Sequence, residues 1–194
     1  MDNQRNFVIS DTHFGHKSFI ECGMRPFKSI EEHDDTIINN INSLVHKQDK
    51  LWILGDFSLK GNKEYLKSIV DRINCKRLYM VLGNHDQRQG DWFKRYNEIG
   101  FEWVSKYPVI YKGFFILSHE PIFLATDRRF EGIVEGKGLE YSNLPWFHNI
   151  FGHIHHLEYT DKKHYTNVCV EKTNYYPIDL DELCENLTNK YNEQ

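Results

Sequence analysis

The sequence contains no hydrophobic run that approaches the roughly 18 residues needed to cross a bilayer. Cysteine is scarce as well: Cys22, Cys75, Cys169 and Cys184 lie far apart and form no Cys-x-x-Cys pair. This pattern disfavours a disulfide framework and a thiolate zinc site. Positive charge is not in excess, because 24 Lys and Arg residues are set against 28 Asp and Glu residues, giving a net charge of -4. That balance argues against an extended binding surface for long nucleic acid.

The residues before the first apolar run do not resemble a secretory signal. Residues 1–6 are polar, and the positive start, apolar middle and small-residue cleavage site of a signal peptide are missing. We therefore expect a cytoplasmic protein with reduced cysteines and no membrane association. The length of 194 residues and the hydrophobic content of 40% predict a single folded domain over residues 1–194.

Short apolar runs predict buried β-strands at residues 7–9, 51–54, 78–82, 114–117 and 150–151. Stretches of helical period separate the early runs, and one of them begins with the capping-box pattern Ser29-x-x-Glu32. Strands spaced by helices predict βαβ units and a sheet that is at least partly parallel. From Tyr107 onward the strands follow one another without long helices, which favours antiparallel pairing there. We expect an α/β fold of two packed mixed β-sheets flanked by helices.

The segment from Glu120 to Pro145 has no clear periodicity and contains three glycines. Loops of that length are usually functional, so we interpret residues 120–145 as a lid or an insert. Arg128 and Arg129 lie in this segment. They are either an ordinary solvated pair or ligands for a substrate phosphate.

A recurring pattern marks the ends of the predicted strands. Five apolar runs end in a small residue that is followed by a potential metal ligand: Ser10-Asp11, Gly55-Asp56, Gly83-Asn84, Ser118-His119 and Gly152-His153. Two of these ends carry a further histidine two residues on, His13 and His155. Ligands of open α/β sheets gather at the carboxyl ends of strands, and a small residue lets the backbone approach a bound group. One such end would mean little, but five of them predict an active site at this edge.

Seven side chains in these blocks suit a pair of divalent cations: Asp11, His13, Asp56, Asn84, His119, His153 and His155. They offer carboxylate, amide and imidazole donors and no thiolate, which favours transition metals over Ca²⁺. We expect Mn²⁺, with Fe²⁺, Zn²⁺, Co²⁺ or Ni²⁺ as alternatives. Two metals roughly 3.5–4 Å apart need a bridging carboxylate. Asp56, in the middle of the set, is the natural bridge.

The blocks together resemble the calcineurin-like metallophosphoesterase superfamily. The matching blocks are Asp11-x-His13, Gly55-Asp56, Gly83-Asn84-His85-Asp86, His119 and Gly152-His153-x-His155. They occur in order and span most of the chain, from Ile9 to His155. The opening Asp11-Thr12-His13-Phe14-Gly15-His16 looks like that of the small stand-alone enzymes of bacteria and their phages.

The resemblance implies a role for each block. Asp11, His13 and His155 would bind the first metal, and Asn84, His119 and His153 the second. Asp56 would bridge them together with a water or hydroxide. His85 would donate a proton to the leaving oxygen, with Asp86 orienting it, since a carboxylate raises the charged fraction of a histidine. His16 lies three residues after His13 and could line the pocket or serve the structure alone.

Three functions fit this reading. The first is a dinuclear metal-dependent phosphoesterase that hydrolyses a small phosphodiester through the bridging hydroxide. The second is a phosphomonoesterase with the same site, and the third is a non-catalytic interaction module. The full ligand set with His85 favours an enzyme, and the scarcity of cations in the motif blocks favours a diester. The expected partner is a small phosphoester or nucleotide, long nucleic acid is disfavoured, and the oligomeric state stays open.

Overall fold

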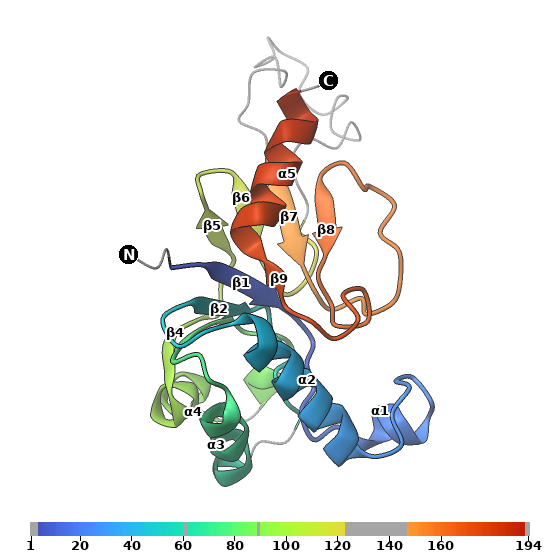
Figure 1. The fold of residues 1–194 in the computed structure, drawn as a ribbon, viewed down its shortest axis with the longest axis vertical. Coiled ribbons are helices and arrows are strands. Elements are labelled where there is room, and N and C mark those ends of the chain that lie inside the picture. Colours follow the sequence, from blue (N-terminus) through green and yellow to red (C-terminus); the bar gives the residue numbers. More distant parts are fainter. Residues whose placement is uncertain (1–3, 60–61, 89, 123–146, 193–194) are drawn as a thin grey trace.

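Two β-sheets form the centre of the molecule (Figure 1). The computed structural model describes residues 4–59, 62–88, 90–122 and 147–192. The first sheet has the order β4-β3-β2-β1-β9, and the second has the order β5-β6-β7-β8. The first sheet contains β1 (Asn6–Ile9), β2 (Lys50–Ile53), β3 (Arg77–Val81), β4 (Phe101–Ser105) and β9 (Ile178–Asp179). The second contains β5 (Val109–Tyr111), β6 (Phe115–Leu117), β7 (His148–Phe151) and β8 (Tyr165–Asn167).

Strands β1 to β4 of the first sheet are parallel, and only the short β9 pairs antiparallel, with β1. Their side chains alternate between two cores. In β1, Phe7 and Ile9 face one hydrophobic cluster while Val8 faces the other. Strands buried on both faces have nearly continuous apolar runs, which is the pattern that marked them in the sequence. The predicted strands and the two mixed sheets are confirmed.

The second sheet differs from the prediction. Strands β5 and β6 are antiparallel as expected, but β6 pairs parallel with β7, and β7 pairs parallel with β8. Antiparallel pairing after Tyr107 was therefore wrong for most of this sheet. Parallel neighbours need a connection of about a dozen residues or more, and such a connection need not be a helix. The connections formed by residues 118–147 and 152–164 both reach this length, so β7 and β8 can begin at the same end of the sheet as β6.

Helices flank the two sheets. Their bounds are α1 (Lys17–Glu21), α2 (Ile30–Leu44), α3 (Lys63–Arg72), the 3₁₀ turn η1 (Asp86–Arg88), α4 (Trp92–Ile99) and α5 (Leu180–Asn192). The predicted cap of α2 is present, because the Ser29 side chain accepts a hydrogen bond from the Glu32 backbone nitrogen at 3.1 Å. The Glu32 carboxylate accepts from the backbone nitrogen of Lys28, one residue before the position that a capping box predicts.

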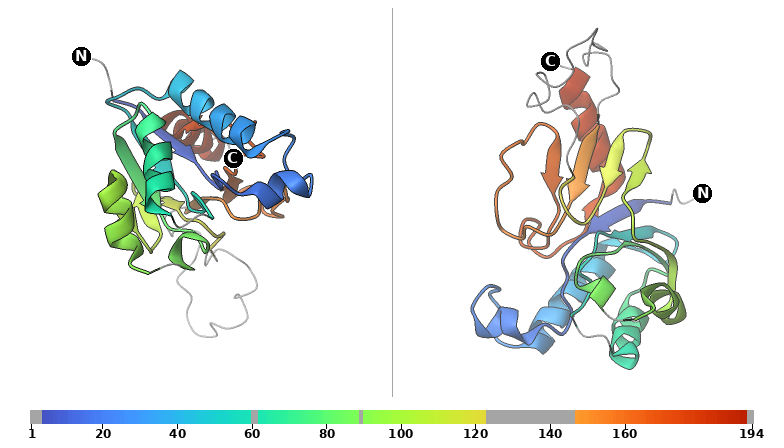
Figure 2. Two further views of the ribbon diagram at one scale, coloured as in Figure 1. Left: turned by 90° about the horizontal axis from the view of Figure 1, so that it is seen from below. Right: turned by 180° about the vertical axis from the view of Figure 1, so that it is seen from behind.

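The two faces of the first sheet have different neighbours. Helices α2, α3 and α4 lie on one face, and the second sheet and α5 lie on the other (Figures 1 and 2). The core between the sheets joins Val8 and Trp52 of the first sheet to Phe115 and Ile150 of the second, and Leu180 of α5 closes it. Each fully buried large apolar side chain contributes about 1.5–3 kcal/mol, so this shared core holds the two sheets, and the strand ends that they carry, in a fixed relation.

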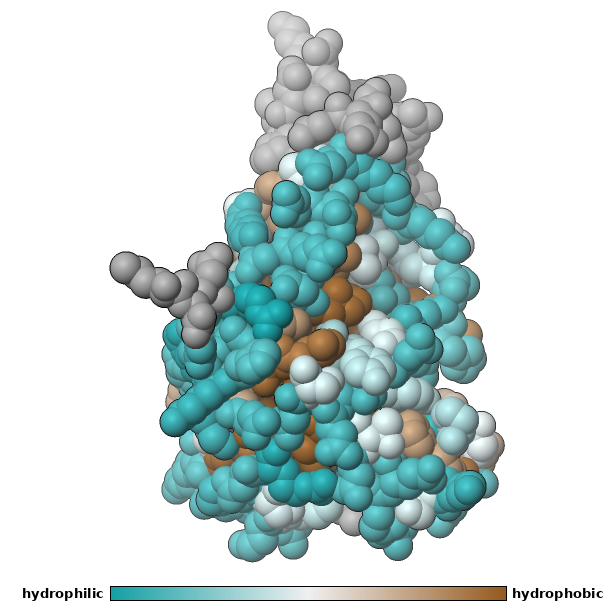
Figure 3. All heavy atoms as spheres, viewed as in Figure 1, coloured by the Kyte–Doolittle hydropathy of each residue, from teal (hydrophilic) through white to brown (hydrophobic). Residues whose placement is uncertain are grey.

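The surface seen in Figure 3 is mostly hydrophilic, with hydrophobic residues visible in a band between α5 and α2. None of the helices in the described ranges is long and apolar enough to cross a membrane. The expected lid falls largely on residues 123–146, which lie outside the described residues. A lid at 120–145, a single domain over residues 1–194 and a cytoplasmic location therefore stay predictions.

Candidate metal centre

The five marked strand ends meet where the two sheets come together. The backbone nitrogen of His13 donates to the Asp56 carbonyl at 2.9 Å, which joins the ends of β1 and β2. The backbone nitrogen of His153, after β7, donates to Asp11 Oδ2 at 2.8 Å, which joins the two sheets. The parallel arrangement of β1, β2 and β3 and of β6 and β7 thus places the carboxyl ends at one site.

The backbone of this site is strained where the candidate ligands lie. Five of them adopt the left-handed region: Asp11 (φ 58°), His13 (φ 48°), Asp56 (φ 50°), His153 (φ 68°) and His155 (φ 51°). Such conformations cost of order 1 kcal/mol or more each and persist where the surroundings impose them. Each turn aims a side chain from a strand end into the space between the sheets. These backbone conformations lower the stability of the fold, but they point the candidate ligands at one another.

The glycines before the ligands are required by close approach. A Cβ on Gly83 would collide with the side chain and backbone nitrogen of Asp56, and one on Gly152 would collide with the side chains of Ser10 and Asp11. The glycines in the sequence pattern thus have a steric cause. At these positions the strand ends approach so closely that no β-carbon fits.

We expect Gly83→Ala to lower metal binding and turnover together, because the added methyl displaces Asp56. Metal content after dialysis, measured alongside thermal unfolding, checks this prediction. Gly113→Ala is the matched control for an added methyl group: Gly113 has open space around its Cβ position, and its φ of 86° strains any replacement. Loss of stability without loss of metal in Gly83→Ala would contradict the expectation.

The side chains form two clusters with metal-ligand geometry. The ligand atoms of Asp11, His13 and His155 lie within 4.8 Å of one another, and so do those of Asp56, His119 and His153. Asn84, the remaining predicted ligand, places its Oδ1 3.0 Å from His119 Nε2. All seven side chains singled out in the sequence therefore come together.

Asp56 lies between the two clusters. Its Oδ2 is 3.5 Å from His13 Nε2 in the first cluster and 3.5 Å from His119 Nε2 in the second. A carboxylate in that position can contact cations on both sides, which is the arrangement that a dinuclear centre needs. Asp56 thus lies where a bridging carboxylate would lie, and its bridging role stays a prediction.

The first cluster contains polar atoms that fit a cation. Asp11 Oδ1 and His13 Nε2 are buried, and within the described part of the chain neither has a hydrogen-bond partner. A buried polar atom without a partner costs about 1–3 kcal/mol. Burial lowers the pKa of His13, which favours the neutral ring that a metal ligand needs. Burial opposes the charge on Asp11, but the neighbouring His13 and His119 outweigh it and hold the pKa of Asp11 well below its usual range. The donor set therefore suits a divalent cation.

Hydrogen bonds behind the rings select the ring nitrogen that faces each cluster. His119 Nδ1 lies 2.9 Å from the Leu54 carbonyl, and His155 Nδ1 lies 3.0 Å from Glu171 Oε1. A ring nitrogen at that distance from a carbonyl or carboxylate carries the proton and donates it, which leaves Nε2 of both rings for a metal. Burial disfavours the charged form of His155, but Glu171 outweighs it and raises the pKa of His155.

His85 lies at the rim of the clusters. Its backbone nitrogen donates to Asp56 Oδ1 at 2.9 Å, and its Nε2 is 3.8 Å from Asp56 Oδ2. The side chain is 22% exposed, whereas that of Asp56 is 3% exposed. His85 is thus near the candidate metals and accessible to a substrate from solvent.

Asp86 occupies a different place from the one predicted. It is buried, and its carboxylate accepts hydrogen bonds from three backbone nitrogens and from the Tyr96 hydroxyl at 2.7 Å. The His85 ring is not a donor in this set. Burial, together with the charge of Asp56, raises the pKa of Asp86 to about 6. We conclude that Asp86 fastens the ligand-bearing loops. The backbone donors are Asp56 at 2.7 Å, Phe57 at 3.2 Å and Gly83 at 2.8 Å.

His16 lies beside the first cluster, which fits both roles that the sequence left open for it, lining the pocket or serving the structure alone. Its Nδ1 is 3.3 Å from His13 Nδ1, and its ring stacks on Phe19 with centroids 3.9 Å apart. Burial and the nearby His13 lower the pKa of His16 to about 4. Contact with substrate stays a prediction for His16. The same holds for Arg128 and Arg129, which lie outside the described residues.

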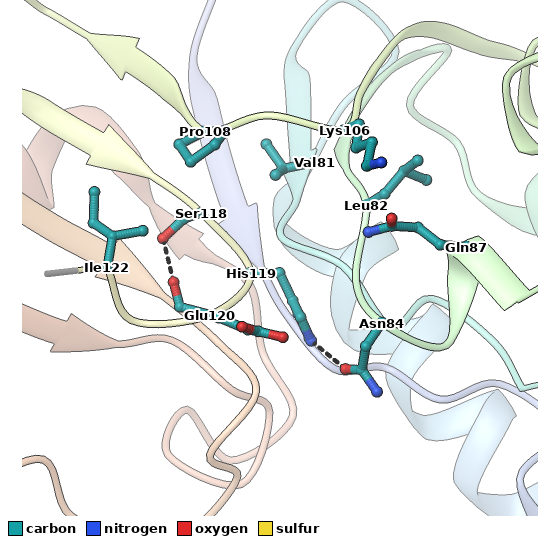
Figure 4. Close-up of a pocket in the computed structure, with 10 residues that line it drawn as sticks. All are labelled: Val81, Leu82, Asn84, Gln87, Lys106, Pro108, Ser118, His119, Glu120 and Ile122. Atoms are coloured by element: carbon teal, nitrogen blue, oxygen red, sulfur yellow. Dashed lines mark hydrogen bonds between the residues drawn. The ribbon is translucent and has the colours of Figure 1, made fainter.

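A cavity of about 440 Å³ adjoins the second cluster (Figure 4). Asn84 and His119 form its inner wall, with Gln87 and Lys106 on the side of the first sheet and Glu120 on the side of the second. Ser118 and four apolar side chains complete the described lining: Val81, Leu82, Pro108 and Ile122. Its size lies within the range of small-molecule sites.

Sequence reasoning missed several residues that contact the clusters. Arg25 is buried and donates to the Asp11 carbonyl at 2.6 Å and to Glu171 Oε1 at 2.7 Å. Cys169, interpreted as a packing residue, places its Sγ 3.2 Å from Asp11 Oδ2. None of these residues belongs to a motif block, and Arg25 is 146 positions from Glu171. A long-range ion pair of this kind leaves no local signal.

A two-sheet α/β fold with two metal-ligand clusters at the strand ends defines a metallophosphoesterase-like protein. The chain belongs to the calcineurin-like phosphoesterase family, which it matches over residues 5–181. The family predicted from the motif blocks is thereby confirmed.

Relatives share much of the chain. It is 32% identical over 189 residues to an uncharacterized protein of Methanocaldococcus jannaschii, covering 93% of this chain and 90% of that protein. It is 45% identical over 83 residues to the gene 66 protein of Mycobacterium phage L5, covering 41% of this chain and 39% of the phage protein. A solved structure of a protein of unknown function from Aquifex aeolicus has a TM-score of 0.62 and 24% identity, covering 94% of this chain and 99% of that one. This likeness supports the fold.

Proposed function

We propose that the protein hydrolyses small phosphodiesters, such as a linear or cyclic nucleotide, with two divalent cations. Family membership supports a metal-dependent phosphoesterase. The observation that carries the proposal is the position of Asp56 Oδ2, 3.5 Å from a histidine nitrogen of each cluster. Asp11, His13 and His155 would hold the first cation, and Asn84, His119 and His153 the second. When bound, the cations neutralise phosphoryl oxygens and supply a nucleophilic hydroxide at neutral pH.

The mixture of donors supports Mn²⁺ as the cation. Imidazole nitrogens occur together with carboxylate and amide oxygens. The Cys169 thiol lies beside the site, against Asp11 Oδ2, and burial strongly raises its pKa. A protonated thiol is a poor metal ligand. Fe²⁺, Zn²⁺, Co²⁺ and Ni²⁺ share these preferences in part, and elemental analysis of the purified protein distinguishes them.

The charge around the site favours a diester over a monoester. A monoester carries about two negative charges near neutral pH and a diester carries one, so monoester sites gather cationic side chains beyond the metals. Arg25 is fully buried and engaged by Glu171, so it cannot reach a substrate. Lys106 is the cation among the described residues of the cavity wall. The positive charge of one lysine and two metal ions suits a phosphate that carries one negative charge and a second organic group.

The cavity offers a place for that second substituent. It starts at Asn84 and His119 and has both apolar walls and polar groups, among them the Gln87 amide and the Glu120 carboxylate (Figure 4). A phosphodiester carries an organic group on either side of phosphorus, and the cavity can take one while the other leaves. His85, at the rim, is placed to hold the proton that the departing alkoxide needs.

A comparison of two chromogenic substrates tests the proposal. We expect the Mn²⁺-loaded protein to have a higher kcat/KM for bis-nitrophenyl phosphate than for mono-nitrophenyl phosphate. A screen of linear and cyclic nucleotides then identifies the leaving group that the cavity favours. A monoester preference of tenfold or more would overturn the diester proposal and leave the metal centre intact.

A further inference from the structure

We propose that Arg25 and Glu171 are positioning residues for the first metal site and set its affinity separately from that of the second. The inference rests on the dinuclear centre of the proposed function. It follows from one buried ion pair that contacts Asp11 and His155 and that reaches His13 through the carbonyl of Thr12, the residue before it. Among the described residues, neither member of the pair hydrogen-bonds to a residue of the second cluster.

The Arg25 guanidinium is fully buried and holds the loop that carries two of the ligands. It donates to the carbonyl of Asp11 at 2.6 Å and to the carbonyl of Thr12 at 2.9 Å. Those two carbonyls lie within the strained turn, between Asp11 and His13, that aims both side chains into the cluster. Five N–H donors in a rigid fork suit this task, because one side chain can fix two adjacent peptide groups.

Glu171 carries the same connection to the third ligand. Its Oε1 accepts from Arg25 Nε at 2.9 Å and Nη2 at 2.7 Å, and it also faces His155 Nδ1 at 3.0 Å. One carboxylate oxygen thus joins the guanidinium to the ring of His155. The contact fixes the orientation and the tautomer of that ring, which decides whether Nε2 can meet a metal.

The network continues to the end of the ligand loop. Arg25 Nη1 donates to His33 Nε2 at 2.7 Å, and His33 Nδ1 lies 2.7 Å from Asp34 Oδ1. Asp34 in turn accepts from the Gly15 backbone nitrogen at 3.2 Å. The loop that contains His13 is therefore fastened at both ends to groups on or beside α2.

The second cluster has a separate support. Asp86 holds the turn at Asp56, and the Leu54 carbonyl orients His119. Among the described residues, Arg25 and Glu171 make no hydrogen bond to Asp56, His119 or His153. Two supports that do not share a member can be perturbed one at a time. Loss of a group that orients a metal-binding histidine typically costs 10–100-fold in metal affinity.

Calorimetric titration of the metal-free chain with Mn²⁺ tests the inference. In a His153→Ala background, which weakens the second site, we expect Glu171→Gln to reduce the remaining affinity by about 10–100-fold. In a His155→Ala background, which removes the ring that Glu171 holds, the same change should have little effect. Glu158→Gln is the matched control: Glu158 is exposed, and its ion pairs are with Lys162 and Lys172.

Titration of Glu171→Gln in the otherwise unchanged chain guards against a background that does not fold. We expect one tight and one weakened site there, and the tight site shows that the fold survives. Equal losses at both sites would reduce Arg25 and Glu171 to a general structural role, and unchanged affinities would remove the inference. The readout of this test is metal affinity and not substrate preference. If the protein binds two metals but prefers monoesters, the diester proposal fails and the inference about Arg25 and Glu171 stands.

Discussion

Asp56→Asn should abolish the dinuclear centre and reduce turnover by more than about 100-fold. Loss of a group that merely orients a ligand already costs 10–100-fold, and Asp56 faces both clusters directly. A neutral amide cannot balance two cations, and only one of its two donor atoms is an oxygen. We expect fewer than two metals per chain by elemental analysis, together with the loss of phosphoesterase activity.

The control is Asp35→Asn, the same change at an exposed position where the carboxylate pairs with Arg72. It should leave metal content and activity near the wild-type values, since a surface ion pair contributes about 0–1 kcal/mol. EDTA should inactivate the wild-type protein, and added Mn²⁺ should restore it. Full activity after exhaustive chelation, with no metal detected, would contradict the dinuclear interpretation.

The candidate ligands could be predicted because each is set by a local rule. A buried strand, a small residue and then a ligand occupy three or four consecutive positions, so the signal lies within a short stretch of sequence. Gly83 and Gly152 illustrate why the pattern is strict, since a Cβ at either position would collide with a neighbouring strand end. The parallel order of β1, β2 and β3 then brings the ends together without further information.

What could not be predicted depends on contacts between distant segments. The direction of β7 and β8 depends on which strands they pair with, and the apolar pattern of a short strand is the same in either direction. Arg25 and Glu171 meet across 146 positions. Asp86 follows His85 directly, so adjacency suggested a partnership, but the 3₁₀ turn η1 sends the two side chains to different neighbours.

The place of Asp86 in the structure changes what would support His85 as a proton donor. The Asp86 carboxylate is engaged by backbone nitrogens and Tyr96, whereas the backbone nitrogen of His85 donates to Asp56 Oδ1. Asp56 Oδ2 also lies 3.8 Å from Nε2 of the His85 ring, so the charge of Asp56 favours a proton on that ring. The bridging carboxylate would thus serve both metal binding and proton donation.

His85→Asn should separate these two functions. We expect close to two metals per chain, because His85 is outside the seven-residue ligand set and its backbone contact to Asp56 does not depend on the side chain. Turnover of a diester with an alkyl leaving group should fall by about 10²–10⁴-fold, the usual effect of removing a positioned proton donor. Elemental analysis and kcat measured on the same preparation provide both readouts.

The leaving group distinguishes proton donation from other roles of His85. A nitrophenolate departs without needing a proton, so the variant should lose much less activity on bis-nitrophenyl phosphate than on an alkyl diester. If His85 only bound the phosphate, both substrates would lose activity equally. If the variant instead lost its metals, His85 would be a metal ligand. The rim of the site would then contain no proton donor separate from the ligand set.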